Sequence, residues 1–381
     1  MNLHRPFTAL ALVVTALMLG ACHGGLQRGT HTQGDTVTMA YAKRLTIVKH
    51  DGYTRVDIAN PWKKGQTLHT YLLVPRTAEV PADLPEGTLI RTPLQRAVVF
   101  TSVHCGLFDE LGHRDAVAGV ADLKYIKIPF VQEGCRKGTI ADVGNGLNPV
   151  LEKVIDIDAD ALLLSPFENN GGYGGLEDIG IPIVECADYM ETSPLGRAEW
   201  IRFYGMLLGE EARADSLFHA IEDDYLALKA RAAKANDRPV VLMDKLAGTD
   251  VWYVPGGRST IGLLLRDANC RYPYADDTHS GSLALTFETI LTRFEQADVW
   301  LLRFDADHAI TRQELGNDFE GYRQMRPYKA DRVYGCNVML SMFYEETPFH
   351  PERLLREFVN ILHPELDDGT PLRYYFKLKN P

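Results

Sequence analysis

The side chains best suited to bind a ligand stand directly after short apolar segments of the sequence. Aromatic side chains can form the apolar walls of a binding site, and Arg and Lys can pair with carboxylates or another negative charge. Ligands of open α/β sheets bind beyond the carboxyl ends of the strands. The residues that satisfy this rule are Ser102, His104, Tyr125, Phe167 and Tyr189 in the first half of the chain, and Lys245, Trp252, Tyr253, Arg258 and Arg303 in the second.

Two glutamates occupy similar places in the two halves of the chain. Glu152 and Glu288 each fall in the first turn of an expected helix, and each helix leads to an Ala-Asp pair and an apolar segment. The apolar residues of each helix share one face, which leaves both carboxylates exposed. Two outward carboxylates suit a partner with paired basic pockets. The alternative is that each is a solvated glutamate near the positive end of a helix dipole.

Familiar catalytic motifs are absent from the sequence. The glycines at 144–146 and 171–175 fit neither a P-loop nor a dinucleotide-binding fingerprint, and there is no Gly-x-Ser-x-Gly or His-Glu-x-x-His. His104 beside Cys105 is the only suggestive pair among scattered histidines. We therefore predict no catalytic residues, no metal ligands and no resident cofactor.

In the parts of the chain that must position these residues, apolar segments alternate with helical segments. Apolar runs such as 97–101 and 161–165 are separated by helical stretches, a pattern typical of βαβ units with a parallel sheet. A second series of this kind begins at residue 240. We predict an α/β fold with two Rossmann-like lobes, residues 96–192 and 237–381.

The segments before and between the lobes have their own patterns. Residues 40–95 alternate short β-rich pieces with turn residues, which predicts a β-rich N-terminal appendage. Residues 193–236 read as a helical linker. Within it, 210–235 contain neither Gly nor Pro and predict one long rigid α-helix of about 39 Å. Its expected apolar stripe consists of Leu217, Ile221, Tyr225 and Leu228.

The N-terminus predicts export and a lipid anchor. Residues 1–21 have one basic residue before an apolar run that is too short to span a bilayer, as in a signal peptide. The run ends at Leu19-Gly20-Ala21-Cys22, which resembles a bacterial lipobox, so Cys22 is the expected lipidation site. Residues 22–39 would be a lipidated tether, and the anchor would be the chain's only contact with the membrane. The net charge of −11 in 381 residues argues against nucleic-acid partners.

The other five cysteines do not form a recognisable framework. Their number is odd, so at least one thiol stays free, and the sequence does not determine a pairing. No Cys-x-x-Cys occurs among them, which disfavours a zinc or redox motif. They are Cys105, Cys135, Cys186, Cys270 and Cys336.

Residues 96–365 resemble the periplasmic substrate-binding proteins of iron-siderophore, haem and vitamin B12 ABC importers. The resemblance is carried by several fragments in order rather than by any single motif. These fragments are Arg96 to Ser102, Glu110-Leu111-Gly112, Val117 to Val120, Val143-Gly144, Asn148-Pro149 with Glu152, Trp252 to Gly257, Ile261-Gly262 with Leu264-Leu265, and Phe287-Glu288.

The resemblance implies a partner, a ligand and a location. Glu152 and Glu288 match the two family glutamates that dock onto arginines of an inner-membrane permease dimer, which works with its ATPase. The ligand would be an iron chelate, haem or cobalamin, held between the lobes of a protein anchored on the periplasmic face of a bacterial membrane. The appendage at 40–95 and the glycine-rich loop at 169–175 depart from the usual family pattern.

Two other functions stay open on the sequence alone. A lipoprotein that carries haem or another chelate without a permease would use the same cleft but would not need the two glutamates. A metal-chelatase-like enzyme on the same fold would convert the chelate.

Overall fold

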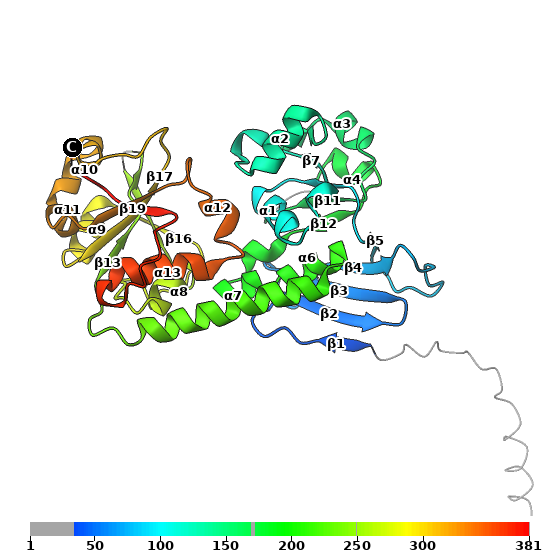
Figure 1. Cartoon of the computed structure of the whole chain (residues 1–381), viewed down its shortest axis with the longest axis horizontal. Helices are drawn as coiled ribbons and strands as arrows, with labels where there is room; N and C mark the ends of the chain where they lie inside the picture. Colours follow the sequence, from blue (N-terminus) through cyan, green and yellow to red (C-terminus); the bar gives the residue numbers. More distant parts are fainter. Residues whose placement is uncertain (1–33, 169–171, 249, 381) are drawn as a thin grey trace, which may run out of the picture.

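The computed structural model describes residues 34–168, 172–248 and 250–380. Its first unit is a five-stranded sheet of order β1-β2-β3-β4-β5, antiparallel except for the parallel pair β4 and β5. This sheet is the β-rich appendage, and it begins within the segment expected to be tether (Figure 1). Its strands are β1 (Asp35–Val37), β2 (Leu45–His50), β3 (Tyr53–Ala59), β4 (Thr67–Pro75) and β5 (Thr88–Thr92).

The N-terminal lobe has a parallel sheet of order β12-β11-β6-β7-β8. Its central strands are buried on both sides, because helices and the appendage cover them. The strands are β6 (Ala97–Val99), β7 (Val117–Val120), β8 (Ala141–Asp142), β11 (Ala161–Leu164) and β12 (Ile183–Glu185), with a small hairpin of β9 (Gly144–Asn145) and β10 (Asn148–Pro149). The helices are α1 (Ser102–Glu110), η1 (Arg114–Ala116), η2 (Leu123–Tyr125), α2 (Pro129–Lys137), α3 (Leu151–Asp156), α4 (Gly175–Asp178) and η3 (Ala187–Met190).

Three helices connect the lobes: α5 (Pro194–Ala198), α6 (Ile201–Leu208) and α7 (Glu211–Ala232). Helix α7 passes beneath both lobes in Figure 1 and packs against α6 and α13 (Pro351–Leu362). At 1.5 Å per residue its 22 residues span about 33 Å. Its buried stripe includes Phe218, whereas Leu217 from the expected stripe is only partly buried.

The appendage is fastened to this connecting segment by two buried carboxylates. Glu199 accepts backbone N–H groups from Ala40, Tyr41 and Ala42, each at 2.8 Å. Glu191 accepts those of Lys43 and Arg44 at 2.9 Å. Because buried carboxylates are costly unless they are hydrogen-bonded, these contacts fix the position of the segment that connects β1 to β2.

The C-terminal lobe has a mixed sheet of order β13-β17-β18-β19, in which only β19 is antiparallel to its neighbour. An antiparallel sheet of order β14-β15-β16 lies beside it. The prediction of an α/β chain with two lobes is therefore confirmed, with one reversed strand in the second lobe. The strands are β13 (Val241–Met243), β14 (Leu246–Ala247), β15 (Val251–Pro255), β16 (Ser282–Leu285), β17 (Val299–Phe304), β18 (Val333–Asn337) and β19 (Tyr375–Lys377). The remaining helices are α8 (Thr260–Asp267), α9 (Phe287–Arg293), α10 (Arg312–Asp318), η4 (Glu320–Gln324), α11 (Arg326–Lys329), α12 (Phe343–Glu346) and η5 (Pro364–Leu366).

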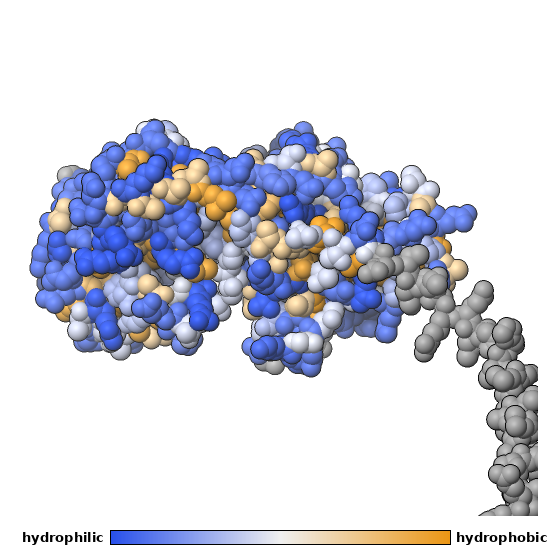
Figure 2. Space-filling view, turned by 90° about the horizontal axis from the view of Figure 1, so that it is seen from below, coloured by the Kyte–Doolittle hydropathy of each residue, from blue (hydrophilic) through white to orange (hydrophobic). Residues whose placement is uncertain are grey.

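The surface seen from below is mainly hydrophilic, with small hydrophobic areas on both lobes (Figure 2). Among the described residues, no helix combines the length and hydrophobicity that a membrane span requires.

A buried imidazole joins the two lobes. His350 lies just before α13, and its Nε2 is 2.7 Å from Glu110 of α1, whereas its Nδ1 is 2.9 Å from Glu352. Arg353 lies within 3.6 Å of both carboxylates. Desolvation lowers the pKa of His350, but the hydrogen bonds to Glu110 and Glu352 together raise it by more. The pKa is therefore about 8, above the usual value of 6.5. His350 is therefore a cation at neutral pH and bridges the lobes.

Raising the pH is expected to remove this bridge and to lower the free energy of unfolding by about 2 kcal/mol. A pKa that folding raises stabilises the protein fully below the unfolded value of 6.5, and that stabilisation is lost as the pH rises through about 8. Denaturant unfolding at about pH 6 and about pH 9 checks this for the wild type and His350→Gln. The variant should lose less stability over this interval, and equal losses would contradict the assignment.

Candidate functional site

The carboxyl ends of four neighbouring strands in the N-terminal lobe lie along one edge of the sheet. Tyr189 follows β12, Phe167 follows β11, Ser102 follows β6 and Tyr125 follows β7. The exposed fractions are 60% for Tyr125, 50% for Phe167 and 36% for Tyr189. The hydroxyl of Tyr189 donates to the carbonyl of Pro166, which holds these two strand ends together. The structure thus places four of the five predicted residues of this lobe along the same edge.

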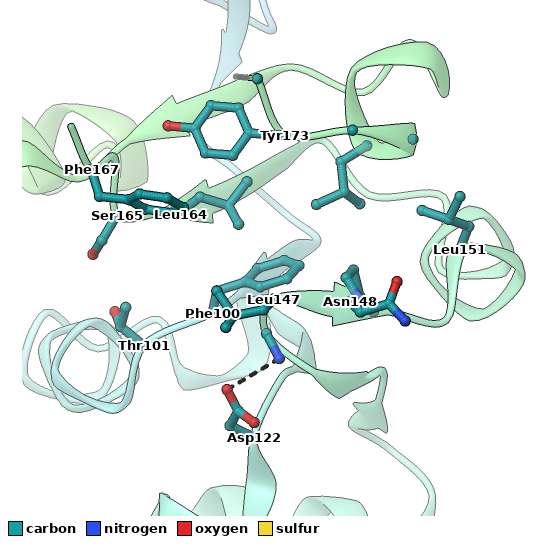
Figure 3. A pocket seen from close by; sticks show the side chains of 16 residues that line it. Phe100, Thr101, Asp122, Leu147, Asn148, Leu151, Leu164, Ser165, Phe167 and Tyr173 are labelled. Atoms are coloured by element: carbon teal, nitrogen blue, oxygen red, sulfur yellow. Dashed lines mark hydrogen bonds between the residues drawn. The ribbon is translucent and has the colours of Figure 1, made fainter. Parts of the chain in front are cut away.

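A cavity of about 390 Å³ opens at this edge. Figure 3 shows Phe100, Leu164, Phe167 and Tyr173 around it, so its walls are largely apolar. Mostly apolar pockets with a few polar groups are the usual form of small-molecule sites. Its lining residues are Phe100, Thr101, Asp122, Gly146, Leu147, Asn148, Pro149, Leu151, Leu164, Ser165, Phe167, Gly172, Tyr173, Gly174, Gly175 and Leu176.

Asp122 is the only charged side chain among the described residues that line this cavity. Its Oδ2 accepts the N–H of Gly146 at 3.1 Å, the contact drawn in Figure 3. A Cβ on Gly146 would lie 2.7 Å from the same oxygen, so a larger residue here would displace the Asp122 carboxylate. The cavity therefore offers an acidic group and no cation, which disfavours ligands with free carboxylates.

Of the five residues predicted in this lobe, only Phe167 lines the cavity, because Ser102, Tyr125 and Tyr189 lie elsewhere along the edge and His104 is buried. His104 is 1% exposed, because its place in α1 directs the ring inward. Its Nδ1 contacts the Thr101 hydroxyl, and its Nε2 lies 3.0 Å from Asp188 Oδ1 and 2.9 Å from the Tyr204 hydroxyl. Desolvation lowers the pKa of His104, but Cys186 and Asp188 raise it more strongly, to about 10. The imidazole is a structural cation behind the strand ends.

Asp188 is the centre of this buried network. Its Oδ2 accepts a hydrogen bond from Arg197 Nε at 2.9 Å, and its Oδ1 accepts one from the Tyr204 hydroxyl at 2.8 Å. Desolvation raises its pKa, yet the charges of His104 and Arg197 lower it to about 2. Because Asp188 directly precedes Tyr189, the network fixes the backbone that presents Tyr189 at the carboxyl edge of the sheet.

Trp252 of the C-terminal lobe is also buried, at 0% exposure. Its Nε1 donates to the carbonyl of Met243 at 2.8 Å, and its ring packs on Trp300. It is therefore a core residue and not part of a ligand surface. Tyr253 points to the other face of β15, as strand alternation requires, and is 47% exposed. Arg258 is exposed in the turn before α8.

The other two predicted cations already have carboxylate partners. Lys245 Nζ lies 2.7 Å from Asp318 Oδ2. Arg303 Nε and one of its terminal nitrogens donate to the two oxygens of Asp244 at 2.8 and 2.6 Å, a bidentate pair. Desolvation lowers the pKa of Arg303, but Asp244 raises it well above its usual value. Both side chains lie at strand ends of the second sheet, yet neither offers an unpaired charge to a ligand.

The sequence prediction missed an exposed apolar group that follows β18. Met339, Leu340 and Tyr344 are 48%, 62% and 53% exposed. Lys127, which follows the end of β7, donates to the carbonyl of Val338, so the carboxyl edges of the two sheets face each other here. Exposed apolar side chains therefore lie at the carboxyl edges of both sheets. The run Val333–Asn337 contains Gly335 and Asn337, so its apolar signal was too weak to identify the strand.

Glu152 and Glu288 are exposed in the first turns of α3 and α9. Neither forms an ion pair with a described residue. Val150 and Ile155, close to Glu152 in the sequence, are 41% and 53% exposed. Exposed apolar residues around a charged group are typical of protein interfaces.

All five cysteines after residue 33 are free: Cys135 is half-buried and the other four are buried. Within the described residues there is no group of three His, Cys, Asp or Glu side chains placed to hold a metal ion. Cys22, the signal peptide and most of the tether lie outside the described residues.

Comparison with known proteins shows one family. The family model for periplasmic binding proteins matches residues 98–338, which include the cavity and most of the sheet of each lobe, although not β19. A relative with 26% identity over 371 residues, covering 90% of this chain and 86% of its own length, is an uncharacterised lipoprotein of Methanocaldococcus jannaschii.

Solved structures share this fold at low sequence identity. A periplasmic heme binding protein from Pseudomonas aeruginosa aligns with a TM-score of 0.58 and 18% identity, over 76% of this chain and 100% of its own. An ABC-type Fe3+-hydroxamate transport system protein from Saccharomonospora viridis aligns with a TM-score of 0.53 and 20% identity, over 71% of this chain and 93% of its own.

Proposed function

Because the chain belongs to the periplasmic binding protein family, we propose that it is the solute-binding component of an ABC importer. It captures a metal chelate between its lobes and delivers it to an inner-membrane permease dimer that works with its ATPase. The observation that carries this proposal is the apolar cavity at the carboxyl edge of the first sheet, with exposed apolar residues at the facing carboxyl edge of the second sheet. Chelates such as ferric siderophores, haem and cobalamin have large apolar surfaces that such walls can cover.

The charges around the cavity favour a ferric chelate without free carboxylates over haem. Haem carries two propionates, whereas Asp122 supplies a negative charge and both Lys245 and Arg303 are already paired. An ionised carboxylate beside Asp122 would be repelled. A neutral or cationic hydroxamate chelate has no such cost, which makes it the better candidate.

Titration with three chelates tests this proposal. Ferric desferrioxamine B should bind with a dissociation constant of about 1 μM or lower, and haemin at least about tenfold more weakly, because of the repulsion at Asp122. Cyanocobalamin is the third probe. Failure of all three to bind below about 100 μM would contradict the proposal. Release of free metal or porphyrin during the titration would indicate an enzyme instead.

We further propose that the protein is anchored through Cys22 on the periplasmic face. Two or more acyl chains give stable membrane attachment, whereas a protein without them is not retained. Replacing the thiol in Cys22→Ser should therefore move the protein from the membrane pellet to the periplasmic fraction. Fractionation followed by immunoblotting measures this, and undiminished pelleting of the variant would rule out the anchor.

A further inference from the structure

Tyr173, a wall of the cavity, is held by its hydroxyl group. Its ring lies on the side of the cavity away from Asp122 (Figure 3), and its hydroxyl donates to Glu185 Oε1 at 2.9 Å. Desolvation and the nearby Glu185 raise the pKa of Tyr173 well above its usual value, so it remains a donor. The position of this ring therefore depends on where the Glu185 carboxylate lies.

Glu185 is buried at the junction of the first lobe and the appendage. It belongs to β12, the edge strand of the lobe's sheet, and is 8% exposed. Its second oxygen, Oε2, is buried and accepts no hydrogen bond from a described residue. The nearest basic atom to that oxygen is Nδ1 of His69, at 3.4 Å, which comes from β4 of the appendage. A buried carboxylate needs such a partner to offset its desolvation.

The appendage holds His69 and Glu185 in this geometry. His69 Nε2 lies 2.7 Å from the Thr88 hydroxyl on β5, so a proton on Nδ1 faces Glu185 when Thr88 donates to Nε2. The His69 ring stacks on Tyr71, with centroids 4.4 Å apart. The Tyr71 hydroxyl accepts the N–H of Glu185 at 2.8 Å and donates to the carbonyl of Ile183 at 3.2 Å. The appendage thus also covers the open edge of β12.

We propose that His69 and Glu185 are positioning residues that set the place of Tyr173 in the ligand cavity. The β appendage then contributes to the binding site. Side-chain contacts connect it to the cavity in the order Thr88, His69, Glu185 and Tyr173. This inference rests on the proposed function, because it takes the cavity as the ligand site.

Variants of the full chain test the connection. His69→Phe keeps the stacking on Tyr71 and removes the contact with Glu185, and Tyr173→Phe removes only the hydroxyl. Thr88→Val is a milder change that leaves His69 in place. The matched control is His50→Phe, since His50 stacks on Tyr53 in the same sheet at 4.7 Å and has no contact with the cavity.

Hydrogen–deuterium exchange of residues 172–178 is the first measurement. Tyr173→Phe loses the hydrogen bond to Glu185 and His69→Phe loses the ionic contact with Glu185, so both should speed exchange there by about fivefold, and Thr88→Val by less. His50→Phe should leave it unchanged. If residues 172–178 exchange in His69→Phe as slowly as in the wild type, His69 does not position Tyr173 through Glu185, and the proposal is overturned. This readout needs no ligand, so it decides the connection even where no chelate binds and the proposed function fails.

Affinity for ferric desferrioxamine B is the second measurement. His69→Phe and Tyr173→Phe should each weaken binding by about three- to tenfold, His50→Phe should not weaken it, and the double variant His69→Phe/Tyr173→Phe should be no weaker than Tyr173→Phe alone. Additive losses would show that His69 does not act through Tyr173 and would overturn the proposal.

Discussion

Reversing the charge of both Glu152 and Glu288 is expected to abolish stimulation of the transporter ATPase while leaving chelate binding intact. Both carboxylates are exposed at the first turns of α3 and α9, and neither lines the cavity. Lysine at these positions would face the basic pockets of a permease, and like charges at an interface typically cost several kcal/mol. Folding should lose only about 0.3–1 kcal/mol per site through the helix dipole.

The measurement is ATP hydrolysis by membranes that contain the cognate transporter, with each protein added at saturating chelate. Asp156→Lys/Glu295→Lys is a matched control, because Asp156 is exposed at the far end of α3 and Glu295 is exposed just after α9. It changes the net charge equally and should stimulate the ATPase like the wild type. Normal stimulation by Glu152→Lys/Glu288→Lys would contradict permease docking through these residues, whereas a wild type that does not stimulate the ATPase would favour a carrier that needs no permease.

Filling the cavity with Ser165→Trp is expected to weaken chelate binding by at least about 100-fold. Ser165 directly follows β11 and lines the cavity, so an indole there would occupy space that the ligand needs. The protein should still fold, since the new ring extends into an existing cavity and not into the packed core.

Titration with ferric desferrioxamine B, together with a thermal melt, checks this prediction. Ser165→Ala is the control, because it removes the hydroxyl without filling space, and its affinity should stay within about threefold of the wild type. Wild-type affinity in Ser165→Trp would place the ligand elsewhere.

Much of the fold could be predicted because its signals are local. Buried parallel strands are continuous apolar runs, and the rule that ligands lie beyond strand ends placed Ser102, Tyr125, Phe167 and Tyr189 along one edge. Strand β18 was missed because Gly335 and Asn337 interrupt its apolar pattern.

The errors concern contacts between residues far apart in the sequence. Nothing near His104 indicates that Asp188 and Tyr204 will bury it, and nothing near Arg303 indicates that Asp244 will neutralise it. Trp252 and Tyr253 are adjacent, so strand alternation predicts that one is buried, but only the sheet's packing decides which. The lipidation of Cys22 and the docking glutamates stay predictions.

The most direct test of the central claim, that this chain binds a metal chelate in the cavity of its first lobe, is native mass spectrometry of protein isolated from its own host. The absorption spectrum of the same sample identifies any bound chromophore. We predict one metal chelate per wild-type molecule and none on Ser165→Trp isolated in the same way. A wild-type protein without a bound chelate that also binds none when the host's chelates are added, or the same bound species on Ser165→Trp, would contradict the account.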